Sequence, residues 1–399
     1  MNVFSDVVGQ EEAVRELQRA AQAAHEVRSA FADSSQSEMA SAAMSHAWLI
    51  TGPPGSGRSL AARAFAAALE CTGEELGCGQ CSSCRAVMAG NHPDVTVVST
   101  DLVTISADEV RGYVASSYQA PGSGHWRVFI IEDADRMLTR TTNVLLKAIE
   151  EPGPRTVWML CTAAVADVLP TIRSRCRNVN LVTPSEQAIV DLLVRRHGAS
   201  EQEARVAVAA AQHHIGLAQA LITDKTAVEL RSRTLDFLVQ VRGVGDAALA
   251  AQVLVDPQLM GGASKAADEE SIAQEEAERL AALGLEVGAK VPVALRAQMK
   301  SAGVDAKRRA TRRLQDTIDR ELTYMISFFR DVLVCQMGAE VALVNSDYEK
   351  YIRQCAEQNS VISILRRIDA LAEARTRLTS NVAPQLLMES ALMQARIAQ

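Results

Sequence analysis

The sequence predicts a parallel α/β fold in the first half of the chain and an all-helical second half. Over the first ~180 residues, short apolar runs of strand length alternate with helix-like segments, which is the pattern of a parallel sheet flanked by helices. A glycine-rich sequence follows the first apolar run, where such folds place a strand-to-helix turn. After Thr183 the strand signals nearly vanish.

The length indicates how many domains to expect. A chain of 399 residues predicts roughly two or three domains at about 150 residues each. We expect residues 1–182 to form the α/β domain, with a cysteine module at 71–84. Residues 183–240 should form a small helical domain and residues 241–399 a second helical domain. The composition, 48% apolar but only 4% aromatic, agrees with a helix-rich chain.

Charge and hydropathy argue against an unaided nucleic-acid-binding protein and against a membrane-spanning or secreted protein. The net charge of -7 argues against unaided binding to a nucleic-acid backbone, so any DNA contact should be local or shared with partners. No apolar run approaches the ~18 residues of a membrane span, and the first residues lack the basic and apolar segments of a signal peptide. We therefore expect a cytoplasmic protein whose thiols stay reduced.

Apolar runs and periodicity predict the elements of the α/β domain. The predicted strands are His46–Thr51, Val95–Val98, Val128–Ile131 and Val157–Cys161. The predicted helices are Ser59–Leu69, Ala107–Ser117 and Thr141–Ile149. Residues 28–45 are rich in Ser, Ala, Met and Gln with weak periodicity, which predicts a loop or an insertion.

Longer amphipathic helices are predicted in the second half. Ser185–His197 and Glu201–Leu221 are separated by a Gly-containing break, with Ser200 as the N-cap of the second helix. Apolar residues at steps of three or four predict a long helix over Ala306–Met337. A basic run at 307–313 near its start indicates a solvated face or a contact with DNA or an acidic partner. Nothing indicates a role for residues 256–305.

Four cysteines have the spacing of a metal site. Cys71, Cys78, Cys81 and Cys84 form a C-x6-C-x2-C-x2-C pattern, and four thiolates can complete a tetrahedral Zn²⁺ site. Such a site is structural, because no coordination position stays open. The alternative is a reduced chain with scattered buried thiols. The other four cysteines, which lack this spacing, are predicted to be ordinary thiols; they are Cys161, Cys176, Cys335 and Cys355.

The glycine-rich sequence Gly52-Pro-Pro-Gly-Ser-Gly-Arg58-Ser59 matches a phosphate loop. Gly52, Gly55 and Gly57 would let backbone N–H groups surround phosphates, and the Ser59 hydroxyl would hold Mg²⁺. Arg58 stands where the motif has Lys, and a forked guanidinium does not replace a compact ammonium. Binding of ATP with Mg²⁺ is compatible with the loop, but efficient hydrolysis is not expected. A purely structural Gly/Pro turn is the alternative.

An acidic pair follows the third predicted strand. Active ATPases of this type place Asp-Glu there, with one carboxylate on the metal and the other near the attacking water. This chain has the reverse order, Glu132-Asp133, which moves each carboxylate by about a methylene. Placement errors near 1 Å can cost ~100-fold in rate, so the order predicts a degraded site. The alternative is a pair of surface acids at a strand end.

Together with a further motif, Ser174-Arg175-Cys176, these residues resemble the bacterial clamp-loader family of AAA+ proteins. The resemblance is strong over about residues 2–225, whereas the remainder resembles the family only in its helical character. The motifs that carry it are Phe4–Gln10, the phosphate loop, the cysteine module, Asn91-His92-Pro93-Asp94, Asn143–Pro152 and Ser174-Arg175-Cys176.

The resemblance implies roles for single residues. Ser174 and Arg175 match an arginine-finger motif, in which Arg175 would reach the ATP site of a neighbouring subunit. The alternative is an arginine that caps a helix C-terminus. Thr162 matches the sensor-one position, and the sensor-two position should fall in Gly216–Leu221, where no Arg occurs. Together with Arg58 and the Glu-Asp order, this departure implies a subunit that does not hydrolyse ATP.

The resemblance also implies an assembly. The implied assembly is a five-subunit clamp loader that contains gamma/tau subunits, a delta subunit and this chain. Such a complex opens the sliding clamp and places it on primed DNA. The chain would be a stator with an AAA+ domain, a helical lid and a helical collar that builds the ring. The alternatives are an active gamma/tau-like motor subunit, a free-standing P-loop kinase or helicase, and a zinc-dependent nucleic-acid-binding module, which the net charge disfavours.

Overall fold

The computed structural model describes residues 2–30, 44–98, 104–122, 124–255, 293–378 and 382–397. The chain divides into two compact units, Met1–Gln219 and Ala220–Gln399. The predicted loop at 28–45 and the segment 256–305 lie largely outside the described residues, as do the side chains of the basic run at 307–313. A separate helical lid over residues 183–240 stays a prediction.

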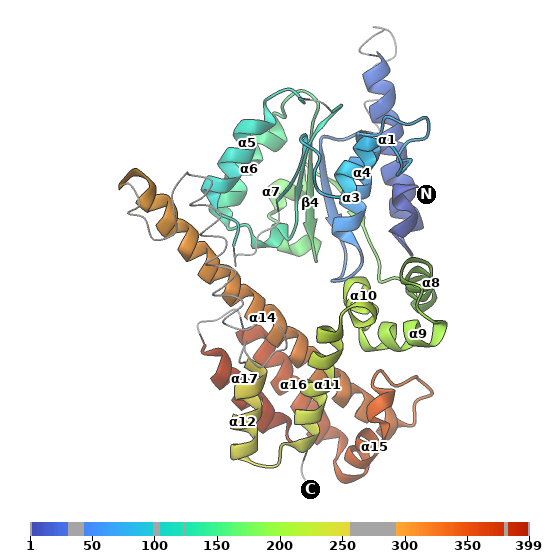
Figure 1. The fold of residues 1–399 in the computed structure, drawn as a ribbon, viewed down its shortest axis with the longest axis vertical. Coiled ribbons are helices and arrows are strands. Elements are labelled where there is room, and N and C mark those ends of the chain that lie inside the picture. Colours follow the sequence, from blue (N-terminus) through green and yellow to red (C-terminus); the bar gives the residue numbers. More distant parts are fainter. Residues whose placement is uncertain are drawn as a thin grey trace. The chain divides into compact units, whose positions relative to one another are not determined.

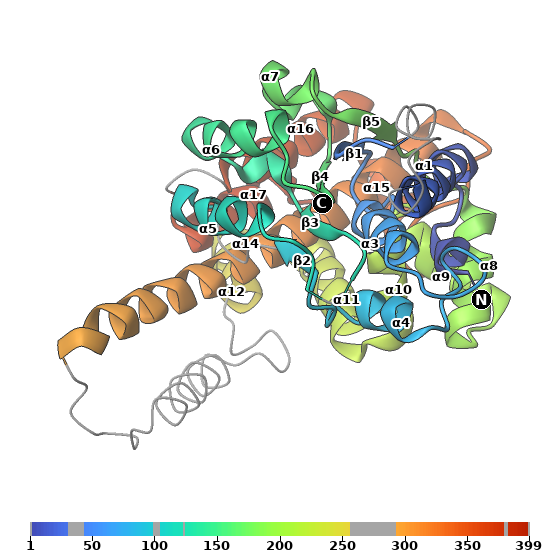
Figure 2. The same cartoon turned by 90° about the horizontal axis from the view of Figure 1, so that it is seen from above.

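A five-stranded parallel sheet is the centre of the first unit. Its strands are β1 (Ala47–Thr51), β2 (Val95–Val98), β3 (Arg127–Ile131), β4 (Thr156–Thr162) and β5 (Arg177–Asn180). The strand order is β2-β3-β4-β1-β5, which can be followed in Figure 2. This confirms the predicted α/β architecture of a parallel sheet flanked by helices. β5 was not predicted, because at this sheet edge only Val179 is buried and its neighbours are polar.

Helices cover both faces of the sheet (Figure 1). One face carries α1 (Glu11–Ala30), α3 (Arg58–Leu69) and α4 (Ser82–Met88). The other carries α5 (Ala107–Ser117), α6 (Thr139–Glu150) and α7 (Pro170–Arg173). Successive strand side chains point to opposite faces, so Trp48 packs with the first set and Leu49 with the second. Burial on both faces explains why the central strands are continuous apolar runs.

Three short helices follow the sheet: α8 (Glu186–His197), α9 (Glu201–Ala210) and α10 (Ile215–Thr223), and the boundary between the two units falls within α10. Ser200 caps α9 in a capping box with Glu203, as the sequence predicts for its N-cap. The continuous helix predicted over Glu201–Leu221 is wrong. Gln212 and His213 adopt positive φ angles of 50° and 64°, which breaks the helix between α9 and α10.

The second unit is all helical in its described part, as predicted. It contains α11 (Lys225–Gln240), α12 (Val244–Val255), α14 (Val293–Met337), α15 (Glu349–Gln358), α16 (Val361–Arg377) and α17 (Pro384–Ala395). α14 starts before the predicted Ala306, and the middle of its apolar stripe, including Ile318, Leu322 and Phe329, is fully buried. Over the described ranges, no helix is both long enough and apolar enough to cross a membrane.

Candidate functional site

The glycine-rich loop joins β1 to α3, as the phosphate-loop motif requires. Gly55 and Gly57 have φ angles of 80° and 91°, which favour glycine. A Cβ atom on Gly55 would lie 2.4 Å from Cγ of His214, and the Ile215 amide donates a hydrogen bond of 3.2 Å to the Gly55 carbonyl. The chain just before α10 therefore closes directly against the loop.

Arg58 turns back onto the loop that precedes it. Its Nη1 donates a hydrogen bond to the carbonyl oxygen of Gly52. Ser59 follows in the first turn of α3, half-buried. The hydroxyl of Ser56 is buried and has no hydrogen-bond partner among the described residues. The charge at position 58 is thus engaged by the protein's own backbone, whereas the motif's lysine reaches a phosphate.

Both carboxylates of the acidic pair form ion pairs with arginines. Glu132 Oε1 lies 3.1 Å from Arg63 Nη2, and Asp133 Oδ2 lies 3.0 Å from Arg136 Nη2. Asp133 also has a φ of 52°, an uncommon backbone conformation for a residue other than glycine. A carboxylate paired with a guanidinium is a poorer ligand for Mg²⁺ than a free one. The sequence reasoning missed Arg63, although it lies one helical turn after Ser59.

The carboxyl ends of β1, β3 and β4 bring the predicted site residues to one edge of the sheet. Gly52 follows β1, Glu132 follows β3, and Thr162 ends β4 opposite Thr51. Thr162 is buried, and its hydroxyl makes a long hydrogen bond of 3.4 Å to the Ala164 carbonyl. Burial raises the pKa of the adjacent Cys161 to about 12, so this cysteine stays a thiol.

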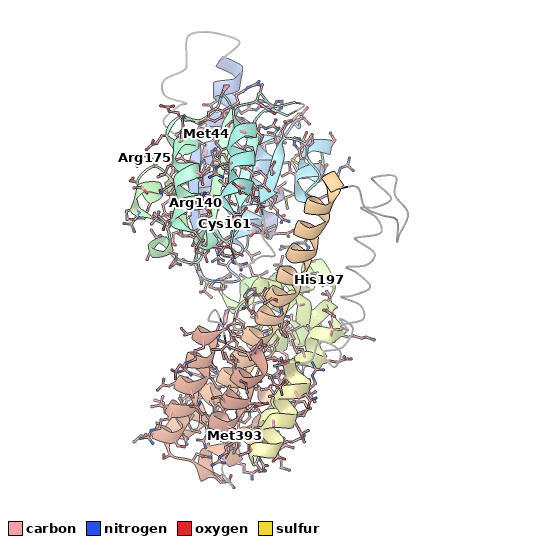
Figure 3. The ribbon with its side chains drawn as sticks, turned by 90° about the vertical axis from the view of Figure 1, so that its left-hand side faces the viewer. Met44, Arg140, Cys161, Arg175, His197 and Met393 are labelled. Carbon is pink, nitrogen blue, oxygen red and sulfur yellow. The ribbon has the colours of Figure 1, made fainter. Side chains whose placement is uncertain are left out.

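Arg175 lies at the outer edge of the first unit, as Figure 3 shows. Its Nη2 is 2.7 Å from Glu150 Oε1, and its Nη1 donates to the Thr171 carbonyl at 2.9 Å and to Ser174 Oγ at 3.3 Å. The bond to Thr171, in α7, is the contact expected of a helix-capping arginine. The side chain is still 41% exposed, so it is also accessible to another protein chain. The following Cys176 packs against the core and anchors the motif.

The four predicted cysteines come together, three from the loop between α3 and α4 and Cys84 from the first turn of α4. Their Sγ atoms lie within 4.8 Å of one another, and they are the one such group in the described part of the chain. Burial raises the pKa of Cys81, but hydrogen bonds from the backbone of Cys84 and Thr72 outweigh it and lower the pKa to about 6. A thiolate is the form that binds metal, and four thiolates fit a structural Zn²⁺.

Two buried carboxylates lie on either side of the cysteine module in the sequence. Glu70, next to Cys71, and Asp94, from the motif Asn91-His92-Pro93-Asp94, both accept hydrogen bonds from the loop between α5 and β3. The donors, at 2.6 to 2.8 Å, are the backbone amides of Gly122, Gly124, His125 and Trp126. Such charge-assisted bonds are strong, so this loop is held firmly at the start of β3.

Comparison with protein families matches two segments of the chain. Residues 27–185 match the model described as "DNA polymerase III, delta subunit", and residues 312–396 match "DNA polymerase III, delta subunit, C terminal". The first match contains the glycine-rich loop, the cysteine module, the acidic pair and the Ser-Arg-Cys motif. The second match covers the C-terminal helices of the second unit.

Individual relatives agree with these matches. DNA polymerase III subunit delta' of Bacillus subtilis is 27% identical over 87% of this chain and 89% of its own length. The delta' subunit of Pseudomonas aeruginosa is 35% identical over 38% of this chain and 47% of its own. Subunit tau of Bacillus subtilis is 30% identical over 47% of this chain, and the match spans 30% of that longer protein. A gamma-subunit-related structure from Thermotoga maritima is 17% identical, and the match covers 94% of this chain and 98% of that chain at a TM-score of 0.42.

Proposed function

Because the chain belongs to the clamp-loader subunits of DNA polymerase III, in the delta prime group, we propose that it acts in the complex as a non-hydrolysing stator. In this role Arg175 reaches in trans into the ATP site of a neighbouring motor subunit and stabilises charge on the transferred phosphoryl group. The observation that carries the proposal is the contrast between an exposed Arg175 and a phosphate-loop site whose charged groups are already paired.

The pairing within the chain's own site supports the lack of hydrolysis. ATP hydrolysis needs a cation at the terminal phosphates, a carboxylate on Mg²⁺ and a second carboxylate near the attacking water. Here Arg58 is bonded to Gly52, and Glu132 is paired with Arg63. Binding ATP productively would require breaking these contacts first. In this role Thr162, at the sensor-one position, takes no part in hydrolysis. Ser59 likewise keeps the hydroxyl of the motif without contributing to ATP hydrolysis in this chain.

We further propose that Cys71, Cys78, Cys81 and Cys84 hold one structural Zn²⁺. The closeness of their sulfur atoms supports this assignment; the pKa of Cys81 is lowered, whereas burial raises the pKa of Cys84, whose proton the metal would have to displace. The metal would fix the turn between α3 and α4 without taking part in chemistry, because no coordination position is left open.

The partners of the proposed role are the gamma/tau motor subunits and the delta subunit, in a hetero-pentamer that opens the sliding clamp for primed DNA. The similarity to subunit tau leaves a motor role as the alternative. Arg58 and the Arg63–Glu132 pair favour the stator, because a motor needs its lysine and a carboxylate available to Mg²⁺.

The test is an Arg175→Ala variant in the reconstituted complex. Since the side chain is partly exposed, the variant should fold and assemble, but clamp-dependent ATP hydrolysis should fall. Arginine fingers contribute factors on the order of a thousand at the site they face, and the total loss is smaller because other motor sites do not face this chain. Arg173→Ala, two residues earlier and also exposed, is the matched control. A complex with Arg175→Ala that loads clamps at the unmodified rate would leave Arg175 as a helix cap.

A further inference from the structure

The ion pair between Arg175 and Glu150 joins two motifs that lie apart in the sequence. Glu150 ends α6, whereas Arg175 follows α7, and the two side chains are 45% and 41% exposed. The guanidinium has five N–H donors in a rigid fork. This chain already engages Nη1 through Thr171 and Ser174, and Nη2 through Glu150. Glu150 supplies the only carboxylate paired with Arg175 among the described ion pairs.

A phosphoryl group would need the donor that Glu150 occupies. Arginine binds phosphate best through two parallel N–H bonds, and the Thr171 and Ser174 contacts already engage Nη1. A second pair of N–H bonds must therefore include Nη2, the nitrogen that Glu150 contacts, so a bound phosphate would compete with the Glu150 carboxylate. A half-exposed ion pair is weak and changes an equilibrium constant by about one- to five-fold, so a polyphosphate can displace the carboxylate.

We propose that Glu150 is a positioning residue that holds Arg175 in place before the complex assembles. After assembly, Glu150 competes for Arg175 with the nucleoside triphosphate bound to the neighbouring subunit. The proposal rests on the proposed trans role of Arg175. Glu150 keeps the long side chain out of alternative rotamers and is then displaced when ATP is present across the interface. The apparent affinity for ATP at that one site is reduced by the fraction of Arg175 that Glu150 holds.

The test compares Glu150→Gln with Glu151→Gln in the reconstituted complex. Glutamine keeps the shape of Glu150 but removes its charge, and the exposed Glu151 is its neighbour without an ion pair in the described residues. Clamp- and DNA-stimulated ATP hydrolysis is measured across ATP concentrations. For the site facing this chain, Glu150→Gln should lower the half-saturating ATP concentration by up to about five-fold, with the maximal rate unchanged. Glu151→Gln should change neither quantity.

The same substitutions in an Arg175→Ala background separate the possible failures. There Glu150→Gln should have no effect, because the group for which it competes is gone. If Arg175→Ala lowers the rate but Glu150→Gln behaves like Glu151→Gln, the competition is refuted while the trans role stands. A Glu150→Gln variant with a lowered maximal rate would also refute it, since Glu150 would then orient Arg175 during the reaction. If Arg175→Ala has no effect, both proposals fall.

Discussion

Replacing Glu321 by glutamine should remove a pH-dependent weakness of the second unit. Glu321 lies on α14 with 0% of its surface exposed, and neither carboxyl oxygen has a hydrogen-bond partner among the described residues. Burial raises its pKa from 4.5 to about 8, against the opposing charges of Arg233 and Arg320. The folded unit therefore keeps this carboxyl protonated at neutral pH.

The sign and size of the effect follow from the two pKa values. Between pH 4.5 and about 8 the folded state holds a proton that the unfolded state has lost, so stability falls as the pH rises through this window. The slope is about 1.36 kcal/mol per pH unit well inside the window and about half of that at pH 8, which gives a loss of about 2 kcal/mol between pH 6 and pH 8. For a unit of this size the loss corresponds to roughly 4–8 °C in melting temperature.

Scanning calorimetry of the full chain at pH 6 and pH 8 measures this loss. Glutamine does not titrate, so Glu321→Gln should lose less stability than the parent between the two values, by about 2 kcal/mol. The exposed Glu340→Gln on the same unit is the control and should follow the parent. Parallel pH dependence of the parent and Glu321→Gln would refute the argument, because it would mean that the buried carboxyl ionises at its ordinary pKa.

Three further outcomes are expected. The purified chain should contain one zinc ion, and Cys81→Ser should lose it together with part of the fold; a metal content near zero under reducing conditions would contradict the site. The isolated chain should show negligible ATP hydrolysis, and turnover that Ser59→Ala abolishes would overturn the stator. Gly124→Ala should lower the free energy of unfolding by about 1.5–3 kcal/mol, the value of one charge-assisted hydrogen bond, because its Cβ would lie 2.4 Å from Glu70 Oε2 and push that carboxylate away from its donors. Gly122→Ala, whose Cβ would meet Asp94 Oδ1 only at 3.7 Å, is the control and should be nearly neutral.

The sequence predicts the elements whose burial leaves a repeating pattern. Four strands are recognisable because helices cover both of their faces and most of their positions are apolar. β5 lies at the edge, buries only Val179, and leaves no such run. The break after α9 depends on positive φ angles at Gln212 and His213, and neither residue type marks such a turn as glycine does.

The sequence predicts the motifs of the candidate site but not the ion pairs that its residues form. Spacing alone identifies the glycine-rich loop and the cysteines, because each needs residues close together in the chain. The Arg63–Glu132 pair joins residues 69 positions apart, and the Glu150–Arg175 pair joins two different helices' ends. No local pattern encodes such contacts, since the sheet and its crossover helices create them.

The Glu70 carboxylate, next to the cysteine module, determines which segments of the first unit should unfold together. Glu70 follows α3 directly and precedes Cys71, one of the four proposed zinc ligands, while its oxygens accept hydrogen bonds from the amides of His125 and Trp126. If the segment at residues 125–126 unfolds locally, the buried Glu70 carboxylate loses its hydrogen-bond donors. If the segment at Glu70 unfolds, the two amides lose their acceptor. The two segments should therefore open as one cooperative unit. In native-state hydrogen exchange, a chelator should accelerate the amides of residues 125 and 126 in step with those of α4. Exchange at the β3 loop that ignores the metal would show that the two segments open independently.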